Sequence, residues 1–284
     1  MHKFSSFVTT AKLVRLMLSE KLADPTRRLL LRHREIKGPE DLGKGISIGT
    51  RVLVLGIYLA DRPNSVEHLV DAFSASRHFQ VTQKWIGLLG QPPSAAVRAV
   101  TDQIILEPRP RSPLLNVLLS GVAWRDYDFV VISDDDIVVP KGFLDALLRY
   151  QIKFDFALAQ AARTPTSYVD HSINRQCLDT VARRTRFVEI GPLMSVRRDF
   201  ASDILPLDEA SPMGWGLDLA WPVLAEKRGL RMGIIDAAAV DHSMRKPRAG
   251  YSAEEAWQSM LDYLETVPHL THKEAKVVLE SYAK

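Results

Sequence analysis

Short apolar runs alternate with amphipathic segments along most of the chain, which predicts strands separated by helices. Residues 51–60 form a continuous apolar run of strand length, and residues 128–132 form a second one. Runs that are apolar at successive positions are typical of central strands that helices cover on both faces. Further strands are predicted at 79–89, 103–106, 155–160, 187–195 and 232–235.

Segments with helical spacing of apolar positions lie between these runs. Predicted helices cover 64–77, 112–119, 142–152, 217–228, 253–266 and 271–283. Alternation of strands and helices without an internal repeat predicts an α/β protein with one Rossmann-like domain, in which helices flank a mostly parallel mixed sheet. We expect three parts: a basic helical extension and linker at 1–45, the main domain at 46–250, and C-terminal helices packed on it at 251–284.

Composition narrows the class of protein. The 284 residues are 46% hydrophobic and 25% charged, as in soluble globular proteins. The single cysteine, Cys177, excludes an internal disulfide and a thiolate metal site, and it fits a reducing, cytoplasmic compartment. Any metal must therefore take oxygen and nitrogen ligands. A net charge of +3 is too small to indicate a nucleic-acid partner, and none is expected.

The excess of positive charge lies in the first 37 residues, which hold nine Lys or Arg against only Glu20, Asp24 and Glu35. The apolar positions there have helical spacing, and Asp24–Pro25 is predicted to end the helix. The segment lacks both a bilayer-spanning apolar run and the features of a secretory signal. It either packs on its own domain or another subunit of a homo-oligomer, or lies peripherally on the inner leaflet of a membrane.

Three consecutive carboxylates, Asp134, Asp135 and Asp136, follow the apolar run at 128–132. Ligands of open α/β sheets collect at the carboxyl ends of strands, and adjacent carboxylates favour a cation. Alternation along an extended segment would direct Asp134 and Asp136 to one side, as ligands of Mg²⁺ or Mn²⁺, and Asp135 to the other. The alternative is an ordinary acidic turn.

The segment Ile132–Ile137 resembles the Asp-X-Asp motif of GT-A-type glycosyltransferases, whose carboxylates hold a divalent cation against the diphosphate of a nucleotide sugar. Four later segments are similar, in order and spacing, to a poorly characterised plant and bacterial GT-A-like family. The resemblance covers roughly 51–247 and implies a UDP- or GDP-sugar donor, with Asp135 among the groups that bind it. The later segments are 187–200, 214–219, 233–236 and 240–242.

Asp218 and Trp215 lie at the predicted start of the helix 217–228. The resemblance implies that Asp218 is the general base that takes the proton of the acceptor hydroxyl. Trp215, between two glycines, is a candidate to stack on a sugar face. Alternatively, Asp218 is a first-turn acid that favours the helix dipole and Trp215 is a core residue. Glu209 is a second acidic candidate in the same loop.

Basic residues and one histidine follow the last predicted strand. The resemblance implies that His242 completes the metal shell, and imidazole beside carboxylates suits Mn²⁺. Arg245 and Lys246 are candidates to neutralise the departing diphosphate. The alternatives are a structural histidine and solvated charges.

Residues after the first strand are candidates for contacts with the nucleoside. The resemblance implies that Asp61, Arg62 and Asn64 contact the base or ribose, although the same residues are good turn and helix-cap formers. Arg109, Arg111 and Asn116 are further candidates for donor contacts. They lie before or within the predicted helix that precedes the acidic strand.

Together these features predict a metal-dependent glycosyltransferase that moves a sugar from a nucleoside-diphosphate donor to a saccharide or glycolipid acceptor. A nucleotidyl or phosphoryl transferase would also need clustered aspartates and basic residues around a metal. A sugar- or nucleotide-binding protein that lacks turnover is the third possibility, because fold analogy alone does not establish activity.

Overall fold

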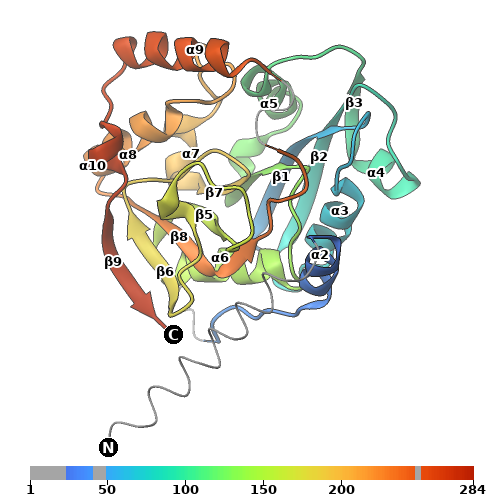
Figure 1. Ribbon diagram of the computed structural model, residues 1–284, viewed down its shortest axis with the longest axis horizontal. Coiled ribbons are helices and arrows are strands. Elements are labelled where there is room, and N and C mark those ends of the chain that lie inside the picture. Colours follow the sequence, from blue (N-terminus) through green and yellow to red (C-terminus); the bar gives the residue numbers. More distant parts are fainter. Residues whose placement is uncertain (1–23, 41–48, 247–250) are drawn as a thin grey trace, which may run out of the picture.

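A nine-stranded mixed sheet forms the centre of the molecule (Figure 1), in the order β3-β2-β1-β4-β7-β5-β8-β6-β9. The computed structural model describes residues 24–40, 49–246 and 251–284. From the strand pairings, seven strands run in one direction and β6 and β7 run in the other, which confirms the predicted α/β class with a mostly parallel mixed sheet. The strands are β1 (Arg51–Leu59), β2 (Gln80–Leu88), β3 (Thr101–Ile105), β4 (Phe129–Asp134), β5 (Phe156–Arg163), β6 (Thr180–Thr185), β7 (Leu193–Arg197), β8 (Arg231–Val240) and β9 (Val278–Ala283).

Helices cover both faces of the sheet. One face packs against α3, α4 and α6, and the other packs against α5, α7, α8 and α9. The described helices are α2 (Asp24–His33), α3 (Val66–Ser74), α4 (Ala95–Val100), α5 (Arg111–Ser120), α6 (Phe143–Lys153), α7 (Arg198–Ile204), α8 (Leu217–Lys227), α9 (Ala253–Thr266) and α10 (His272–Ala275), with 3₁₀ turns at Trp124–Asp126 and Ser172–Asn174.

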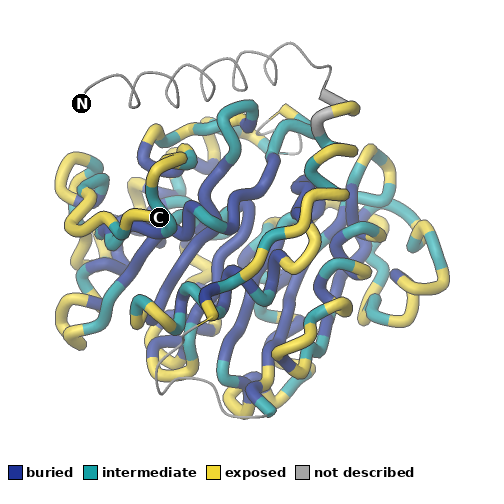
Figure 2. Tube along the Cα trace, turned by 90° about the horizontal axis from the view of Figure 1, so that it is seen from below, coloured by how far each residue is buried: buried dark blue, intermediate teal, exposed yellow. Residues whose placement is uncertain are grey.

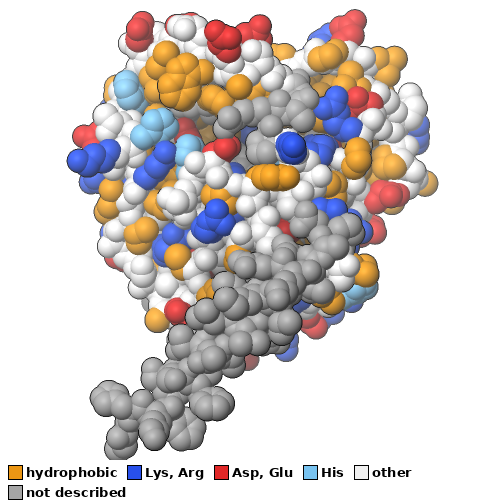
Figure 3. All heavy atoms as spheres, in the orientation of Figure 1, with side chains coloured by type: hydrophobic (Ala, Val, Ile, Leu, Met, Phe, Trp, Pro, Cys, Tyr) orange, Lys and Arg blue, Asp and Glu red, His pale blue; other side chains and the backbone are white. Residues whose placement is uncertain are grey.

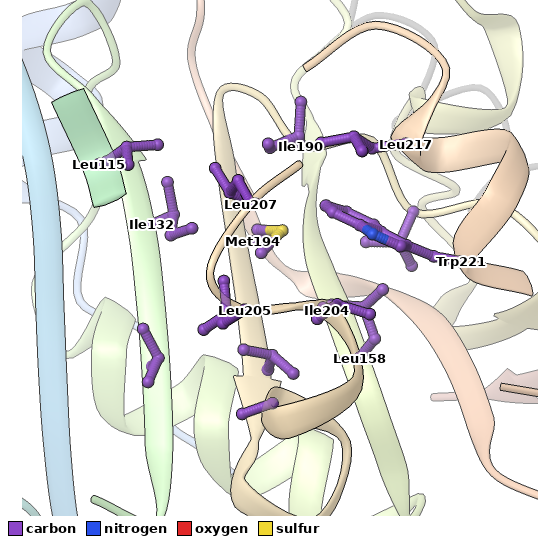
Figure 4. Packing of buried hydrophobic residues seen from close by; sticks show 14 of the residues in the cluster. Leu115, Ile132, Leu158, Ile190, Met194, Ile204, Leu205, Leu207, Leu217 and Trp221 are labelled. Carbon is purple, nitrogen blue, oxygen red and sulfur yellow. The ribbon is translucent and has the colours of Figure 1, made fainter. Parts of the chain in front are cut away.

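Successive residues of the central strands enter two separate cores, which explains their continuous apolar runs. In β1, Val52 and Val54 belong to the core under α3 and α6, whereas Leu53 and Leu55 belong to the core under α5 and α8. The central strands are buried along almost their whole length (Figure 2). In the second core, Ile132 packs in one cluster with residues of β5, β7 and α8 (Figure 4).

Sequence and structure disagree most in the second half. The predicted helix at 271–283 is wrong: after the short α10 the chain forms β9, which pairs with β6 at the sheet edge. β-branched Val277 and Val278 favour a strand, and Tyr282 stacks on Phe154 with ring centroids 4.1 Å apart. Of the predicted strand at 187–195, residues 187–192 form a loop and residues 193–195 begin β7. Strand β6 and helices α4 and α7 were not predicted.

The predicted basic helix of the first residues lies outside the described residues, as does most of the predicted linker. The Asp24–Pro25 pair, predicted to end a helix, belongs to α2 instead. Proline is tolerated in the first turn of a helix, which accounts for this difference. Of the helices in the described ranges, none is long and apolar enough to cross a bilayer.

Candidate functional site

A cavity of about 550 Å³ lies at the carboxyl ends of β1 and β4. Its volume is in the range of small-molecule sites. Acidic, basic and histidine side chains meet at the hollow in the upper half of the face in Figure 3. Most of the predicted site residues line it, namely Arg62, Asp134, Asp135, Asp136, Trp215, Asp218, His242, Arg245 and Lys246.

Asp135 is the most buried carboxylate of the triplet. The backbone N–H of Leu59 donates to it at 2.7 Å, and the Arg245 guanidinium donates to both of its oxygens, with Nη1 3.0 Å from Oδ2. Burial raises the pKa of Asp135 to about 6, against the opposing effect of Arg245. Arg245 thus joins the end of the chain's last long strand to the acidic segment.

Asp136 shares that guanidinium and also contacts His242. Its Oδ2 lies 3.3 Å from Nη2 of Arg245, and its Oδ1 lies 3.3 Å from Nε2 of His242. Burial would raise the pKa of Asp136, but the His242 hydrogen bond and the charges of His242 and Arg245 together hold it below its usual value. This carboxylate is therefore ionised at neutral pH.

Asp134 takes a different partner: Nη2 of Arg111 lies 2.7 Å from its Oδ1. Asp134 and Asp136 line the same cavity, but they have different cationic partners. Strand β4 ends at Asp134, so the strict alternation of an extended segment does not continue through Asp135 and Asp136. Each member of the triplet nevertheless has a cationic partner from a distant segment.

The predicted metal ligands fit a divalent ion in chemistry and only partly in position. Carboxylate oxygens and an imidazole suit Mn²⁺, and Nδ1 of His242 is buried without a hydrogen-bond partner. Asp136 and His242 lie 3.3 Å apart, whereas Asp134 pairs with Arg111. Asp134 also lies close to Gly191, because a Cβ added to that glycine would be 3.0 Å from Oδ2 of Asp134. Among the described residues no three His, Cys, Asp or Glu side chains are arranged to hold a metal ion.

Asp218 lies at the start of α8, on the far side of the same cavity. Gly214 and Gly216 have φ of 83° and 89°, a left-handed conformation that favours glycine and turns the chain into the helix. Burial, and secondarily the negative charge of Glu189, raise the pKa of Asp218 to about 7. Trp215 also lines the cavity and lies edge-on to Tyr251, with ring centroids 6.2 Å apart.

Glu189 is a cavity residue that the sequence analysis did not assign. Arg163 pairs with it at 2.6 Å, and Asn174 donates to the same oxygen. Burial raises the pKa of Glu189, and Arg163 opposes this effect. A carboxylate inside the otherwise apolar segment 187–190 was the signal available in the sequence.

The residues after β1 separate into one cavity residue and two turn residues. Arg62 lines the cavity, while neither Asp61 nor Asn64 is among the lining residues. Asp61 pairs with Arg62 at 3.2 Å, and Nδ2 of Asn64 donates to the backbone oxygens of Leu59 and Arg62. These contacts support the turn-forming alternative for Asp61 and Asn64.

Of the three further candidates for donor contacts, two line the cavity and one does not. Arg109 and Arg111 line the cavity, and Arg111 holds Asp134. Asn116 donates instead to Leu207 and to Glu209, at 2.8 Å and 3.0 Å. Glu209 is exposed and does not line the cavity, so it is poorly placed as a base.

Comparison with known proteins identifies the fold. No protein-family model matches the chain, and no curated protein does. Among solved structures it is similar to GalNAc-T7 with UDP, GalNAc and Mn²⁺, with a TM-score of 0.50 and 9% identity over 75% of this chain and 47% of that one. The fold is that of GT-A glycosyltransferases.

Two other solved structures are similar to the chain. One is the mannosyltransferase PcManGT from Pyrobaculum calidifontis in complex with GDP-Man and Mn²⁺ (TM-score 0.49, 13% identity, 94% of this chain and 75% of that one). The other is S. aureus TarS 1-349 in complex with UDP-GlcNAc (TM-score 0.48, 13% identity, 79% of this chain and 68% of that one). The GT-A-like fold predicted from the sequence is confirmed, while membership of the particular plant and bacterial family stays a prediction.

Proposed function

We propose that the protein is a glycosyltransferase that moves a sugar from a nucleoside-diphosphate donor to a saccharide or glycolipid acceptor. One observation carries the proposal: the same cavity holds carboxylates paired with arginines, Asp134 and Asp135, and a desolvated carboxyl, Asp218. The first arrangement suits an anionic donor, and the second suits proton transfer.

The cavity is lined by several guanidinium groups that suit an anionic donor. Arg62, Arg111 and Arg245 line it together with the exposed Lys246. Arg111 contacts Asp134 and the Ile190 carbonyl oxygen, and Arg245 contacts Asp135, Asp136 and the Pro63 carbonyl oxygen. Within the described residues these contacts use the Nη atoms, and the Nε donors are available to a diphosphate. Their charges would stabilise the nucleoside diphosphate as it leaves.

We propose that Asp136 and His242 hold Mn²⁺ or Mg²⁺, and that Asp134 joins them only when it leaves Arg111. When bound, the ion supplies Lewis-acid stabilisation of the diphosphate. The ion pair between Arg245 and Asp135 places a second positive charge at the acidic triplet, independently of any metal.

Asp218 is the proposed base. With a pKa of about 7 it is partly ionised at neutral pH and can accept the proton of an acceptor hydroxyl. The hydroxyl oxygen then bonds to the anomeric carbon, the bond from that carbon to the phosphate oxygen breaks, and the nucleoside diphosphate leaves with the electron pair. Trp215 is placed to stack on a sugar ring in this cavity.

The proposal is tested by incubating the protein with a panel of UDP- and GDP-sugars and saccharide acceptors, and by measuring release of the nucleoside diphosphate together with the glycosylated product. We expect product from the wild type and none above background from Asp218→Asn. Release of pyrophosphate instead of UDP or GDP would favour a nucleotidyl transferase. Tight binding without any product would favour the non-catalytic alternative.

A further inference from the structure

A group of basic side chains lines the same cavity as Asp218, and one of them, Lys276, acts electrostatically on Asp218. It consists of His171, from the segment between β5 and β6, and of His272 and Lys276, from α10 and the residue that follows it. The backbone N–H of Leu270 donates to Leu219 at 2.9 Å, which ties the C-terminal segment to α8. Figure 1 shows α10 beside α8, at the side of the sheet away from β1.

These three side chains, here called the basic group, gather around Phe187. The His171 and His272 ring centroids are 5.9 Å apart, the His171 ring lies edge-on to Phe187 at 5.0 Å, and the Lys276 ammonium lies 5.9 Å from the Phe187 ring centroid. Within the described residues no carboxylate lies at ion-pair distance from Lys276, and Nδ1 of His272 is buried without a hydrogen-bond partner. Lys276, which lines the cavity, thus has no carboxylate partner among the described residues.

Two of the nearby carboxylates, Glu189 and Asp218, do not account for the basic group. Glu189 is already paired with Arg163 and Asn174. The Lys276 charge lowers the pKa of Asp218 only slightly against burial, because that pKa still rises to about 7. Lys276 is therefore not an ion-pair partner that keeps Asp218 charged.

The electrostatics of the two imidazoles point the same way. Burial, followed by the charges of Lys276 and His272, lowers the pKa of His171 to about 4, and Asp170 and Arg163 act on it in opposite directions. Burial and Lys276 likewise lower the pKa of His272. Positive charge is therefore costly to add here, and an anion would relieve that cost.

We infer that the basic group binds an oxyanion of the acceptor, a phosphate or a carboxylate, and so holds the reacting hydroxyl at Asp218. The inference rests on the proposed function and names the acceptor class as an anionic saccharide or a phosphate-bearing lipid or sugar. Lys276 supplies the charge, and the imidazoles supply N–H donors. Trp257, half exposed beside Met260 at the cavity wall, offers an apolar face to the rest of such an acceptor.

The test follows the histidine ring resonances of the full chain by NMR at pH 7 during titrations with inorganic phosphate, glucuronate and glucose. Phosphate or glucuronate should shift the His171 and His272 resonances and leave His78, which is exposed and outside the cavity, unchanged. The oxyanion that binds more tightly, phosphate or glucuronate, assigns the acceptor as a phosphate ester or a uronate. A titration with phosphate-bearing lipid in vesicles then distinguishes a lipid acceptor from a soluble one. Equal shifts with glucose would overturn the inference.

Lys276→Gln should weaken oxyanion binding at least tenfold, which corresponds to about 1.4 kcal/mol. Lys273→Gln is the matched control, because Lys273 lies three residues before Lys276, in α10, but is exposed and outside the cavity. His272→Gln, which should also weaken binding, serves if Lys276→Gln does not fold. Unchanged oxyanion affinity in both folded variants would overturn the inference.

UDP and GDP are titrated into the same variants so that the two proposals fail separately. Lys276→Gln should bind the nucleotide as tightly as wild type does. Nucleotide binding without oxyanion shifts at His171 and His272 would end the acceptor inference and leave the glycosyltransferase proposal standing. Oxyanion shifts without any nucleotide binding would do the reverse.

Discussion

Asp136 and Asp218 line one cavity, and their surroundings shift the pKa values of the two carboxyl groups in opposite directions. At the triplet, His242 and Arg245 outweigh the burial of Asp136 and lower its pKa. At the start of α8, burial and Glu189 raise the pKa of Asp218 to about 7, with no cation at ion-pair distance in the described part of the chain. A carboxylate that is paired with cations stays charged at neutral pH, whereas a desolvated carboxylate can take up and release a proton near neutral pH.

The largest expected effect comes from the desolvated carboxyl. Asp218→Asn should lower kcat about 1,000-fold, within the usual range for loss of a general base, while nucleotide affinity is unchanged. Initial rates of product formation and calorimetric nucleotide titrations measure the two quantities. Glu209→Gln, in the preceding loop and outside the cavity, should change kcat less than about twofold. Full turnover by Asp218→Asn would show that Asp218 is not the base.

Arg245→Gln tests the paired carboxylates through stability. Removing the guanidinium leaves the buried Asp135 carboxylate without its bidentate partner, so the free energy of unfolding should fall by about 3 kcal/mol. Urea denaturation measures this, with Arg109→Gln as control. Arg109 pairs with Glu107 at 3.8 Å on the surface, so its loss should cost less than about 0.5 kcal/mol. Equal losses in the two variants would show that Asp135 does not depend on Arg245.

The pH profile sharpens the comparison. Because the base works only when ionised, kcat/KM should rise with pH up to the Asp218 pKa of about 7 and then level off. Glu189→Gln removes the negative charge beside Asp218 and should move the midpoint to lower pH. A profile that is flat across the neutral range would exclude Asp218 as the base.

The same shift predicts a stability effect of known sign. Folding raises the Asp218 pKa from 3.8 to about 7, so the folded state binds the proton more tightly than the unfolded state. The group therefore contributes stability below its unfolded pKa and loses it as the pH rises through about 7. Asp218→Asn should abolish this part of the loss of stability with rising pH, which thermal unfolding at a series of pH values measures. A wild-type decline that persists in the variant would assign it to other groups.

The smallest effect separates turn residues from cavity residues. Asn64→Ala removes the hydrogen bonds to Leu59 and Arg62 and should lower the free energy of unfolding by about 1 kcal/mol. Nucleotide affinity should stay within about twofold, and Asp61→Ala should leave both quantities nearly unchanged. A tenfold loss of affinity in Asn64→Ala would restore the nucleoside contact predicted from the sequence.

Predictability differed between the two halves of the sheet. The parallel strands β1 and β4 were predicted because they are buried on both faces and carry apolar runs. Strand β6 was missed because it carries the buried Arg183, which Asp236 neutralises at 2.9 Å across the sheet. Strand β9 was predicted as a helix, since an exposed edge strand has no alternating apolar pattern to reveal it.

The sequence predicted which residues lie at the site better than it predicted which residues pair with one another there. Asp134, Asp218 and His242 reach one cavity because each follows a strand or begins a helix at the same edge of the sheet. Their partners come from distant segments, as in the pairs Arg111–Asp134 and Arg245–Asp135, and sequence spacing does not encode such contacts. The wall formed by the segment 251–276 likewise appears only when the chain is folded.

The most direct test of the central claim is calorimetric titration of UDP and GDP, each with and without Mn²⁺, into the wild type and into Asp136→Ala. We predict that one of the two nucleotides binds the wild type and that Asp136→Ala weakens its binding in Mn²⁺ at least about tenfold. Failure of both nucleotides to bind the wild type under every metal condition would contradict a nucleotide-sugar site at the acidic triplet.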